Sequence, residues 1–157
     1  MGEVLTLNEA RELRVRLRSE QRRCVFTNGH FDLLHVGHLD YLEQARKLGD
    51  ALIVGVNGDR ATQHLKGTGR PIVPAAERAR LLAALSVVDA VVIFDEDTAI
   101  ALIRALEPDI YVKGGDYHTK PLPERSTVET LGGRVILIDL LPDHSTSALI
   151  ARIKALP

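Results

Sequence analysis

Residues 51–56 (ALIVGV) are apolar at every position, and this run constrains the fold more than any other segment of the chain. A strand that faces water on one side alternates polar and apolar residues, whereas a strand covered on both faces has no need to alternate. A strand of the second kind belongs to a parallel sheet with helices packed on both sides. The sequence therefore predicts a three-layer α/β domain.

Strand and helix patterns alternate along the rest of the chain, as a parallel sheet with right-handed crossovers requires. The other strands are predicted at residues 23–27, 87–94, 110–113 and 134–138, which gives a five-stranded parallel sheet. Helices are predicted after Thr6, at 36–48, after Pro74, after Asp97, at 126–131 and after Ser145. Residues 65–71 are glycine-rich and basic and are predicted to form a mobile loop. A length of 157 residues leaves room for one domain, residues 1–157, and for no second one.

Composition excludes several classes of protein. The chain is 45% hydrophobic and 26% charged, as in an ordinary soluble protein, and its net charge of −1 argues against a nucleic-acid binder. No apolar run reaches the roughly 18 residues that span a bilayer, and the N-terminus lacks the apolar core of a signal peptide. We therefore expect no membrane partner and a cytoplasmic location. The single Cys24 cannot form an internal disulfide and is expected to be a small core residue.

Two histidines stand where a strand turns into a predicted helix. The strand at 23–27 is followed by Asn28 and Gly29, and His35 and His38 then lie three residues apart, on one helical face. Gly37 between them lets a bulky group approach the backbone. A helix start also offers unpaired N–H groups and the positive end of the helix dipole, which favour phosphate. The pattern predicts a site that binds a polyphosphate.

Polar residues also follow the apolar strand at 51–56. Asn57, Gly58 and Asp59 lie at its carboxyl end, which is the edge of an open α/β sheet where ligands bind. His64, His118 and His144 are scattered and show no metal-ligand spacing, so no metal site formed by the protein is predicted.

The segment FDLLHVGH, residues 31–38, resembles the HxGH signature of the nucleotidyltransferase superfamily. VNGDRATQHLKGTGRPIVPAAERARLLAAL, VDAVVIFDEDT, PDIYVKGGDY and STSALIARI, in this order and spacing, resemble the adenylyltransferase module of ADP-heptose synthesis. The resemblance implies a Rossmann-like nucleotidyltransferase domain. It also implies transfer of AMP from ATP to a sugar phosphate, D-glycero-β-D-manno-heptose 1-phosphate, with release of pyrophosphate. Mg²⁺ is expected to arrive with ATP, held mostly by phosphates and water.

The resemblance also implies roles for individual residues. His35 and His38 would contact the α and β phosphates, and the predicted catalytic set is His35, His38, Lys66 and Arg78. The predicted nucleotide-binding set is Thr27, Asn28, Gly29, Phe31, Gly37, Lys113, Gly114, Gly115, Asp116, Ser145, Thr146 and Ser147. The predicted acceptor-binding set is Asp32, Asn57 and Asp59.

The chain departs from the family pattern at two positions, and alternatives remain. The family more often has Cys, Val or Thr at His30 and Ser at Gly58, so the acceptor is less firmly implied than the reaction. Glycerol-3-phosphate cytidylyltransferase and an FAD synthetase-like enzyme are rivals, although residues 140–146 lack the arginine of the glycerol enzyme's RTEGIST-like segment. A non-catalytic nucleotide-binding regulator is a third reading. The family's module is often fused to a sugar kinase, and here we expect it to stand alone. The oligomeric state stays open, a homodimer included.

Overall fold

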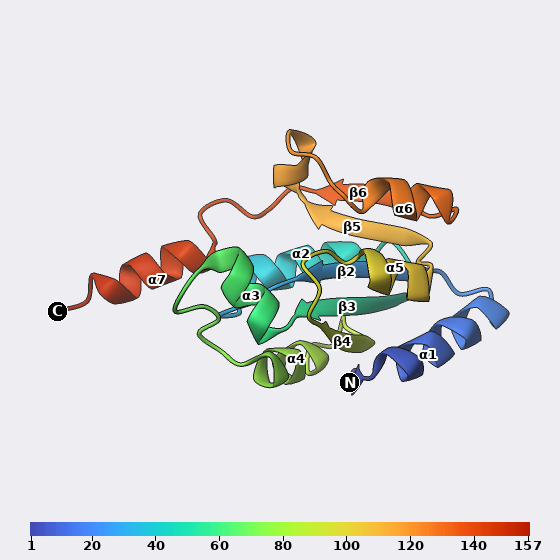
Figure 1. The fold of residues 1–157 in the computed structure, drawn as a ribbon, viewed down its shortest axis with the longest axis horizontal. Helices are drawn as coiled ribbons and strands as arrows, with labels where there is room; N and C mark the ends of the chain where they lie inside the picture. Colours follow the sequence, from blue (N-terminus) through green and yellow to red (C-terminus); the bar gives the residue numbers. More distant parts are fainter.

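A computed structural model describes residues 1–157, with the exception of the side chain of Asp116. The described chain forms a three-layer α/β structure around one parallel sheet, as predicted (Figure 1). The strands are β1 (Glu3–Leu5), β2 (Cys24–Gly29), β3 (Ala51–Asn57), β4 (Ala90–Phe94), β5 (Ile110–Gly114) and β6 (Arg134–Ile138). Their order across the sheet is β1-β4-β3-β2-β5-β6, so the sheet has six strands and not the five predicted.

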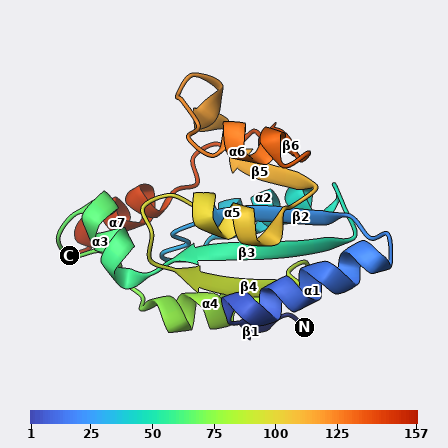
Figure 2. The same cartoon turned by 45° about the vertical axis from the view of Figure 1, so that its right-hand side comes forward.

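Helices cover both faces of the sheet. Their bounds are α1 (Leu7–Ser19), α2 (Val36–Arg46), α3 (Asp59–Lys66), α4 (Ala75–Ala83), α5 (Ile100–Leu106), α6 (Arg125–Thr130) and α7 (Thr146–Lys154), with a 3₁₀ turn at Gly115–His118. One core cluster joins the sheet to α1, α5 and α6, and the other joins its opposite face to α2 and α4 (Figure 2). Every residue of β3 is buried, which is why that strand is apolar without alternation. No helix of the described residues has the length and apolar character needed to cross a membrane.

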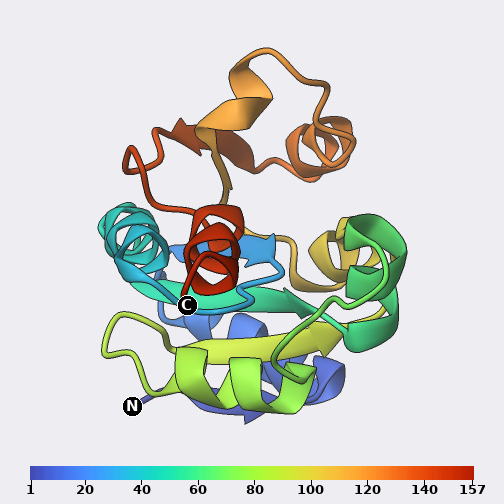
Figure 3. The same ribbon diagram turned by 90° about the vertical axis from the view of Figure 1, so that its left-hand side faces the viewer.

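The order of the strands reverses between β2 and β5. From β2 the chain moves outward through β3 to β4, then returns to place β5 on the other side of β2. Crevices at the carboxyl ends of two such strands are the usual ligand sites of open α/β sheets. Figure 3 looks towards this end of the sheet, where α7 lies in front of the strands and beside the start of α2.

One strand and one α-helix were not predicted. The edge strand β1 is only three residues long and pairs in parallel with β4, so it carries too few residues to show a period. Helix α3 was missed because only Ala61 and Thr62 of its eight residues are buried. As a result, the prediction of a loop at residues 65–71 is wrong at its start: Lys66 lies in the last turn of α3, and the loop begins at Gly67.

Candidate active site

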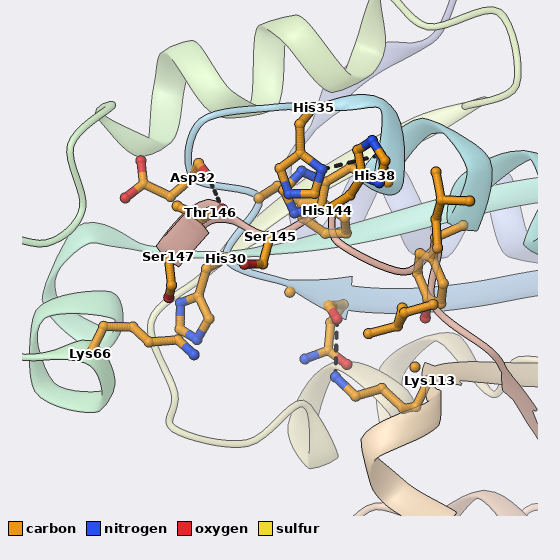
Figure 4. Close-up of a pocket in the computed structure, with 18 of the residues that line it drawn as sticks. His30, Asp32, His35, His38, Lys66, Lys113, His144, Ser145, Thr146 and Ser147 are labelled. Atoms are coloured by element: carbon orange, nitrogen blue, oxygen red, sulfur yellow. Dashed lines mark hydrogen bonds between the residues drawn. The ribbon is translucent and has the colours of Figure 1, made fainter. Parts of the chain in front are cut away.

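A cavity of about 430 Å³ opens at the carboxyl ends of β2 and β5, at the point where the strand order reverses. Its walls come from the turn after β2, the start of α2, the end of α3, the end of β5 and the start of α7 (Figure 4). The predicted site residues that line it are Asn28, Gly29, Phe31, Asp32, His35, Gly37, His38, Lys66, Lys113, Gly114, Ser145, Thr146 and Ser147. Residues from distant parts of the sequence thus meet in one place.

His35 begins α2 as its N-cap residue. Its backbone is extended, and its Nδ1 atom accepts a hydrogen bond of 3.1 Å from the backbone N–H of Gly37. Because Nδ1 accepts, the hydrogen of the neutral ring lies on Nε2. His35 is therefore a hydrogen-bond donor through Nε2, which is the role that binding a phosphate oxygen requires.

His38 lies against His35. Their ring centroids are 3.8 Å apart with an angle of 25° between the planes, and the Phe31 ring also packs against His38, with a centroid distance of 5.4 Å. The Nδ1 atom of His38 is buried and has no hydrogen-bond partner among the described residues. Nε2 is then the ring nitrogen left to meet a ligand in the cavity.

Both rings are neutral at pH 7. Burial, followed by the neighbouring His35, lowers the pKa of His38 from 6.5 to about 4. Burial also lowers the pKa of His35, and His144 adds to that effect. The pair therefore offers preorganised N–H donors in a partly dry site, where such donors act more strongly than in water.

The start of α7 lies beside the start of α2 at the cavity. The Ser145 hydroxyl accepts from the backbone N–H of Ala148, and the Thr146 hydroxyl donates to the backbone carbonyl of Asp32 at 2.6 Å (Figure 4). A Cβ atom on Gly37 would lie 2.9 Å from the Cβ of His144, so the two segments touch at this glycine. Two helix N-termini thus converge on one cavity, and both favour an anion.

Lys113 is the next-to-last residue of β5 and lies on the opposite side of the cavity. Its ammonium group donates to the backbone carbonyl of Asn28 at 3.1 Å and lies 5.2 Å from the centre of the Tyr117 ring. Burial lowers the pKa of Lys113 from 10.5 to about 8, so the group remains mostly protonated at neutral pH. Gly114 follows with no side chain of its own, and Leu140 supplies an apolar surface beside it. This end of the cavity suits a flat base better than a phosphate.

Asp32 is buried, and protein groups use both of its carboxylate oxygens. It accepts from Arg70 Nε at 2.7 Å and from the backbone N–H groups of Ile72 and Val73 at 2.9 and 3.0 Å. Burial alone would raise the pKa of the Asp32 carboxyl, but these three hydrogen bonds together hold it below its usual value. The structure therefore places Asp32 as the anchor of the segment 70–73, although the sequence predicts a contact to the acceptor.

Arg78 lies behind the cavity and does not line it. Its side chain is 1% exposed and donates to the carbonyls of Val73, His30 and Asn57 and to the Asp59 carboxylate. A guanidinium bound in this way holds three loops together, so the arrangement gives no support to a direct phosphate contact.

The remaining predicted residues also lie outside the cavity wall. Thr27 is fully buried and donates to the carbonyl of Val112, Asn57 is buried, and Asp59 accepts from Arg78 and from the N–H of Ala75. Gly115 follows Gly114 but does not line the cavity. Asp116 was also predicted, and its side chain is outside the described part of the structure.

Seven lining residues were missed as site residues: His30, Tyr41, Arg70, Tyr117, Leu140, Leu141 and His144. His30 and Arg70 lie in segments already singled out, in the histidine turn and the basic loop, so polarity and position together would have found them. His144 directly precedes the predicted helix start at Ser145, which is a usable signal. The apolar and tyrosine residues carry no sequence signal that separates lining from core.

Comparison with known proteins agrees with this geometry. The family model described as cytidylyltransferase-like matches residues 26–152. Bifunctional protein HldE of Syntrophotalea carbinolica is 54% identical over 144 residues, which covers 90% of this chain and 29% of that protein. Bifunctional protein HldE of Koribacter versatilis is 50% identical over 151 residues, covering 96% and 31%. The chain thus spans less than a third of the length of these curated relatives.

Two solved structures share the fold. The lipopolysaccharide core biosynthesis protein from Thermoplasma volcanium superposes with a TM-score of 0.63 at 29% identity and covers 76% of this chain and 97% of that one. Pantoate-beta-alanine ligase from Francisella tularensis, complexed with beta-gamma ATP and beta-alanine, superposes with a TM-score of 0.60 over 100% of this chain and 80% of that one. At 13% identity the second likeness concerns the fold alone.

Proposed function

Because the chain belongs to the cytidylyltransferase-like family, we propose that it transfers AMP from ATP to D-glycero-β-D-manno-heptose 1-phosphate, giving ADP-heptose and pyrophosphate. The family makes the domain a nucleotidyltransferase domain. The nucleotide, the sugar and the products are the proposal.

One observation carries the proposal: two helix N-termini and the stacked pair His35 and His38 face the same cavity. N–H groups at a helix start, two neutral imidazole donors and the ammonium of Lys66 all favour a polyphosphate. The relatives named HldE and the lipopolysaccharide core biosynthesis protein support the choice of a sugar phosphate as the second substrate.

The reaction needs positioning and charge stabilisation. A phosphate oxygen of the sugar phosphate attacks the α-phosphorus of ATP, a new P–O bond forms, and the bond to the β-phosphate bridging oxygen breaks as pyrophosphate leaves. Charge builds on the α and β oxygens, and donors held in place before the reaction stabilise it without reorganising. His35 and His38 would supply those donors at the start of α2.

The cavity has separate places for the parts of ATP. Adenine would lie at the end of β5, beside Gly114 and Leu140, where the wall is flat and partly apolar. The β and γ phosphates would lie at the start of α7, beside Ser145. Lys66 at the end of α3 would approach the phosphates from the side of Ser147 and His30 (Figure 4).

Magnesium would enter as part of the substrate, MgATP. The cavity wall supplies donors, and the one carboxylate among its described residues, that of Asp32, is fully bonded to the protein. Phosphate oxygens and water are the ligands that Mg²⁺ prefers in sites of this kind. The residues of the cavity therefore fit an ion that the nucleotide carries.

Pyrophosphate release tests the proposal. Each of the four nucleoside triphosphates is supplied with heptose 1-phosphate, glycerol 3-phosphate or flavin mononucleotide, and release is measured for every pair. We expect turnover with ATP and heptose 1-phosphate. Turnover confined to CTP with glycerol 3-phosphate, or to ATP with the flavin, would replace the proposed substrates. ATP binding without turnover on any acceptor would favour a regulatory module.

A further inference from the structure

We propose that His30 selects the acceptor, because its Nε2 atom accepts a hydrogen bond from a hydroxyl group of the sugar. This inference rests on the proposed function and deepens it. It assigns to one histidine of the cavity a role opposite to that of His35, which donates.

A chain of hydrogen bonds indicates the tautomer of His30. The Thr62 hydroxyl is fully buried and lies 3.3 Å from the backbone carbonyl of Asn57 and 2.9 Å from His30 Nδ1. A carbonyl only accepts, so its contact with Thr62 needs the hydroxyl hydrogen, and we assign the single Thr62 hydrogen to this contact. Thr62 then accepts from His30, which places the ring hydrogen on Nδ1. The Nε2 atom of the neutral ring consequently carries a lone pair and no hydrogen.

The surroundings keep this ring neutral. Burial, followed by the positive charges of Lys66, Arg78, Lys113 and Arg70, lowers the pKa of His30 from 6.5 to about 4. A second proton on Nε2 is therefore unfavourable at neutral pH. His30 is an acceptor in a cavity whose other polar groups are mainly donors: the ammonium of Lys66, the imidazole of His35 and the start of α7.

The chemistry of the substrates indicates what an acceptor here would bind. Phosphate oxygens carry no hydrogen at neutral pH, so His30 Nε2 repels them. Adenine would lie at the end of β5, and Figure 4 places His30 well away from Lys113, beside Lys66 and Ser147. The hydroxyls of the sugar remain as donors. Since Lys66 attracts the phosphate of the acceptor and His30 accepts from its hydroxyls, the two residues together fit a sugar phosphate.

Steady-state kinetics with two substitutions test this. His30→Leu removes the acceptor atom, and His30→Gln keeps an oxygen near the position of Nε2. Loss of one neutral hydrogen bond weakens binding about three- to tenfold. We therefore expect His30→Leu to raise KM for the sugar phosphate by that factor. KM for ATP should stay unchanged, and His30→Gln should recover most of the loss. His64→Leu, a substitution on the exposed side of α3, is the matched control and should behave as the parent protein.

Deoxy substrates identify the partner. We compare heptose 1-phosphates that each lack one hydroxyl. For one of them, KM with the parent protein should be about three- to tenfold higher than for the full substrate, and with His30→Leu the two KM values should be equal. Equal losses for every analogue in both proteins would overturn the proposal. If 2′- or 3′-deoxy ATP shows this His30-dependent rise in KM and the deoxy sugar phosphates do not, His30 contacts the nucleotide. That result would also overturn the proposal.

A readout without turnover separates this inference from the proposed function. Long-range ¹H–¹⁵N NMR of the histidine rings reports which nitrogen carries the hydrogen, and His30→Gln assigns the signal. We expect hydrogen on Nδ1 of His30 and a shift of the Nε2 signal when the sugar phosphate is added without ATP. Hydrogen on Nε2, or no shift under saturating sugar phosphate, would contradict the role of His30. An inactive parent protein that still shows the expected shift would contradict only the proposed function.

Discussion

At the scale of single residues, the stacked pair His35 and His38 is the unusual feature of the site. Burying a polar atom without a partner costs free energy, and the Nδ1 atom of His38 has no partner among the described residues. Such an atom calls for a functional explanation. Contacts with His35 and Phe31 hold the ring in this position, and its other nitrogen, Nε2, is thereby held as a rigid donor towards the cavity.

Replacing that donor tests its role. We expect His38→Ala to lower kcat by at least about a hundredfold, because removal of one preorganised donor of this kind costs roughly 3 kcal/mol in the transition state. His64→Ala removes an exposed histidine and serves as the control. Near-normal turnover of a folded His38→Ala protein, measured by pyrophosphate release, would remove His38 from the mechanism.

The buried histidines also make stability depend on pH. The pKa values of His30 and His38 are lowered from 6.5 to about 4, so between these values the unfolded chain binds more protons than the folded protein. The free energy of unfolding should therefore decrease as pH falls from about 6.5 to about 4. Thermal unfolding across this range should show a falling Tm, and His38→Gln should flatten the slope. An equal slope in His38→Gln and in the control His64→Gln would contradict this account.

At the scale of elements, Asp32 connects the segments that surround the cavity. Its carboxylate holds residues 70–73, and its backbone carbonyl accepts from Thr146 at the start of α7. The turn after β2 therefore fixes the position of two distant segments relative to the histidines. Phosphate binding depends on this arrangement, because a donor displaced by about 1 Å loses much of its effect.

Asp32→Asn disrupts this connection with little change in shape. An amide presents one N–H₂ group, which would face the donors Arg70 Nε and the N–H of Ile72. We expect a loss of about 2 kcal/mol in the free energy of unfolding, since hydrogen bonds to a charged group are lost. Amide hydrogen exchange at Ile72 and Val73 should accelerate. Asp139→Asn, at a side chain that is 95% exposed, should change neither quantity.

The contact between α2 and the segment before α7 is tight at Gly37. A Cβ atom there would lie 2.9 Å from the Cβ of His144 and 3.0 Å from the His35 ring. Gly37→Ala should therefore push the two helix starts apart and weaken ATP binding about tenfold or more, as measured by calorimetry. Glu43→Ala, on the exposed side of the same helix, is the control. Unchanged affinity in Gly37→Ala would show that the spacing of the two helices does not matter.

How far the sequence predicts such features depends on the range of the interactions. The run at β3 and the histidine turn are local patterns, and both were interpreted correctly as a buried parallel strand and as a helix start that lines the cavity. Arg78 shows the limit of this approach. Its place in the sequence suits a phosphate ligand, but its burial depends on carbonyls of His30, Asn57 and Val73 that only the folded chain brings together. The sequence also cannot predict the tautomer of His30, because this depends on the contact with Thr62 that only the folded chain makes.

At the scale of the whole molecule, the parallel sheet determines where the site can lie. The reversal of strand order between β2 and β5 opens one crevice, and the connections after these strands carry the histidine turn and the Lys113–Tyr117 wall. Other contacts supply stability away from the site. Arg14 on α1 is buried and donates to the carbonyls of Leu106 and Glu107 and to the Asp109 carboxylate, far from the cavity.

A substitution at Arg14 should therefore change the stability of the protein without changing its activity. Arg14→Met leaves buried carbonyls and a carboxylate without their donor, and we expect the free energy of unfolding to fall by about 3 kcal/mol. Turnover below the unfolding transition should be unchanged. Urea denaturation and pyrophosphate release measure the two effects, with Arg11→Met on the exposed side of α1 as control. A loss of turnover in the folded Arg14→Met protein would mean that α1 acts on the site.

A crystal structure with a non-hydrolysable ATP analogue and magnesium tests the central claim most directly. We expect the triphosphate between the starts of α2 and α7, with the Nε2 atoms of His35 and His38 within hydrogen-bond distance of its α and β phosphates and adenine beside Gly114. A triphosphate bound outside this cavity, or histidine rings turned away from it, would contradict the account.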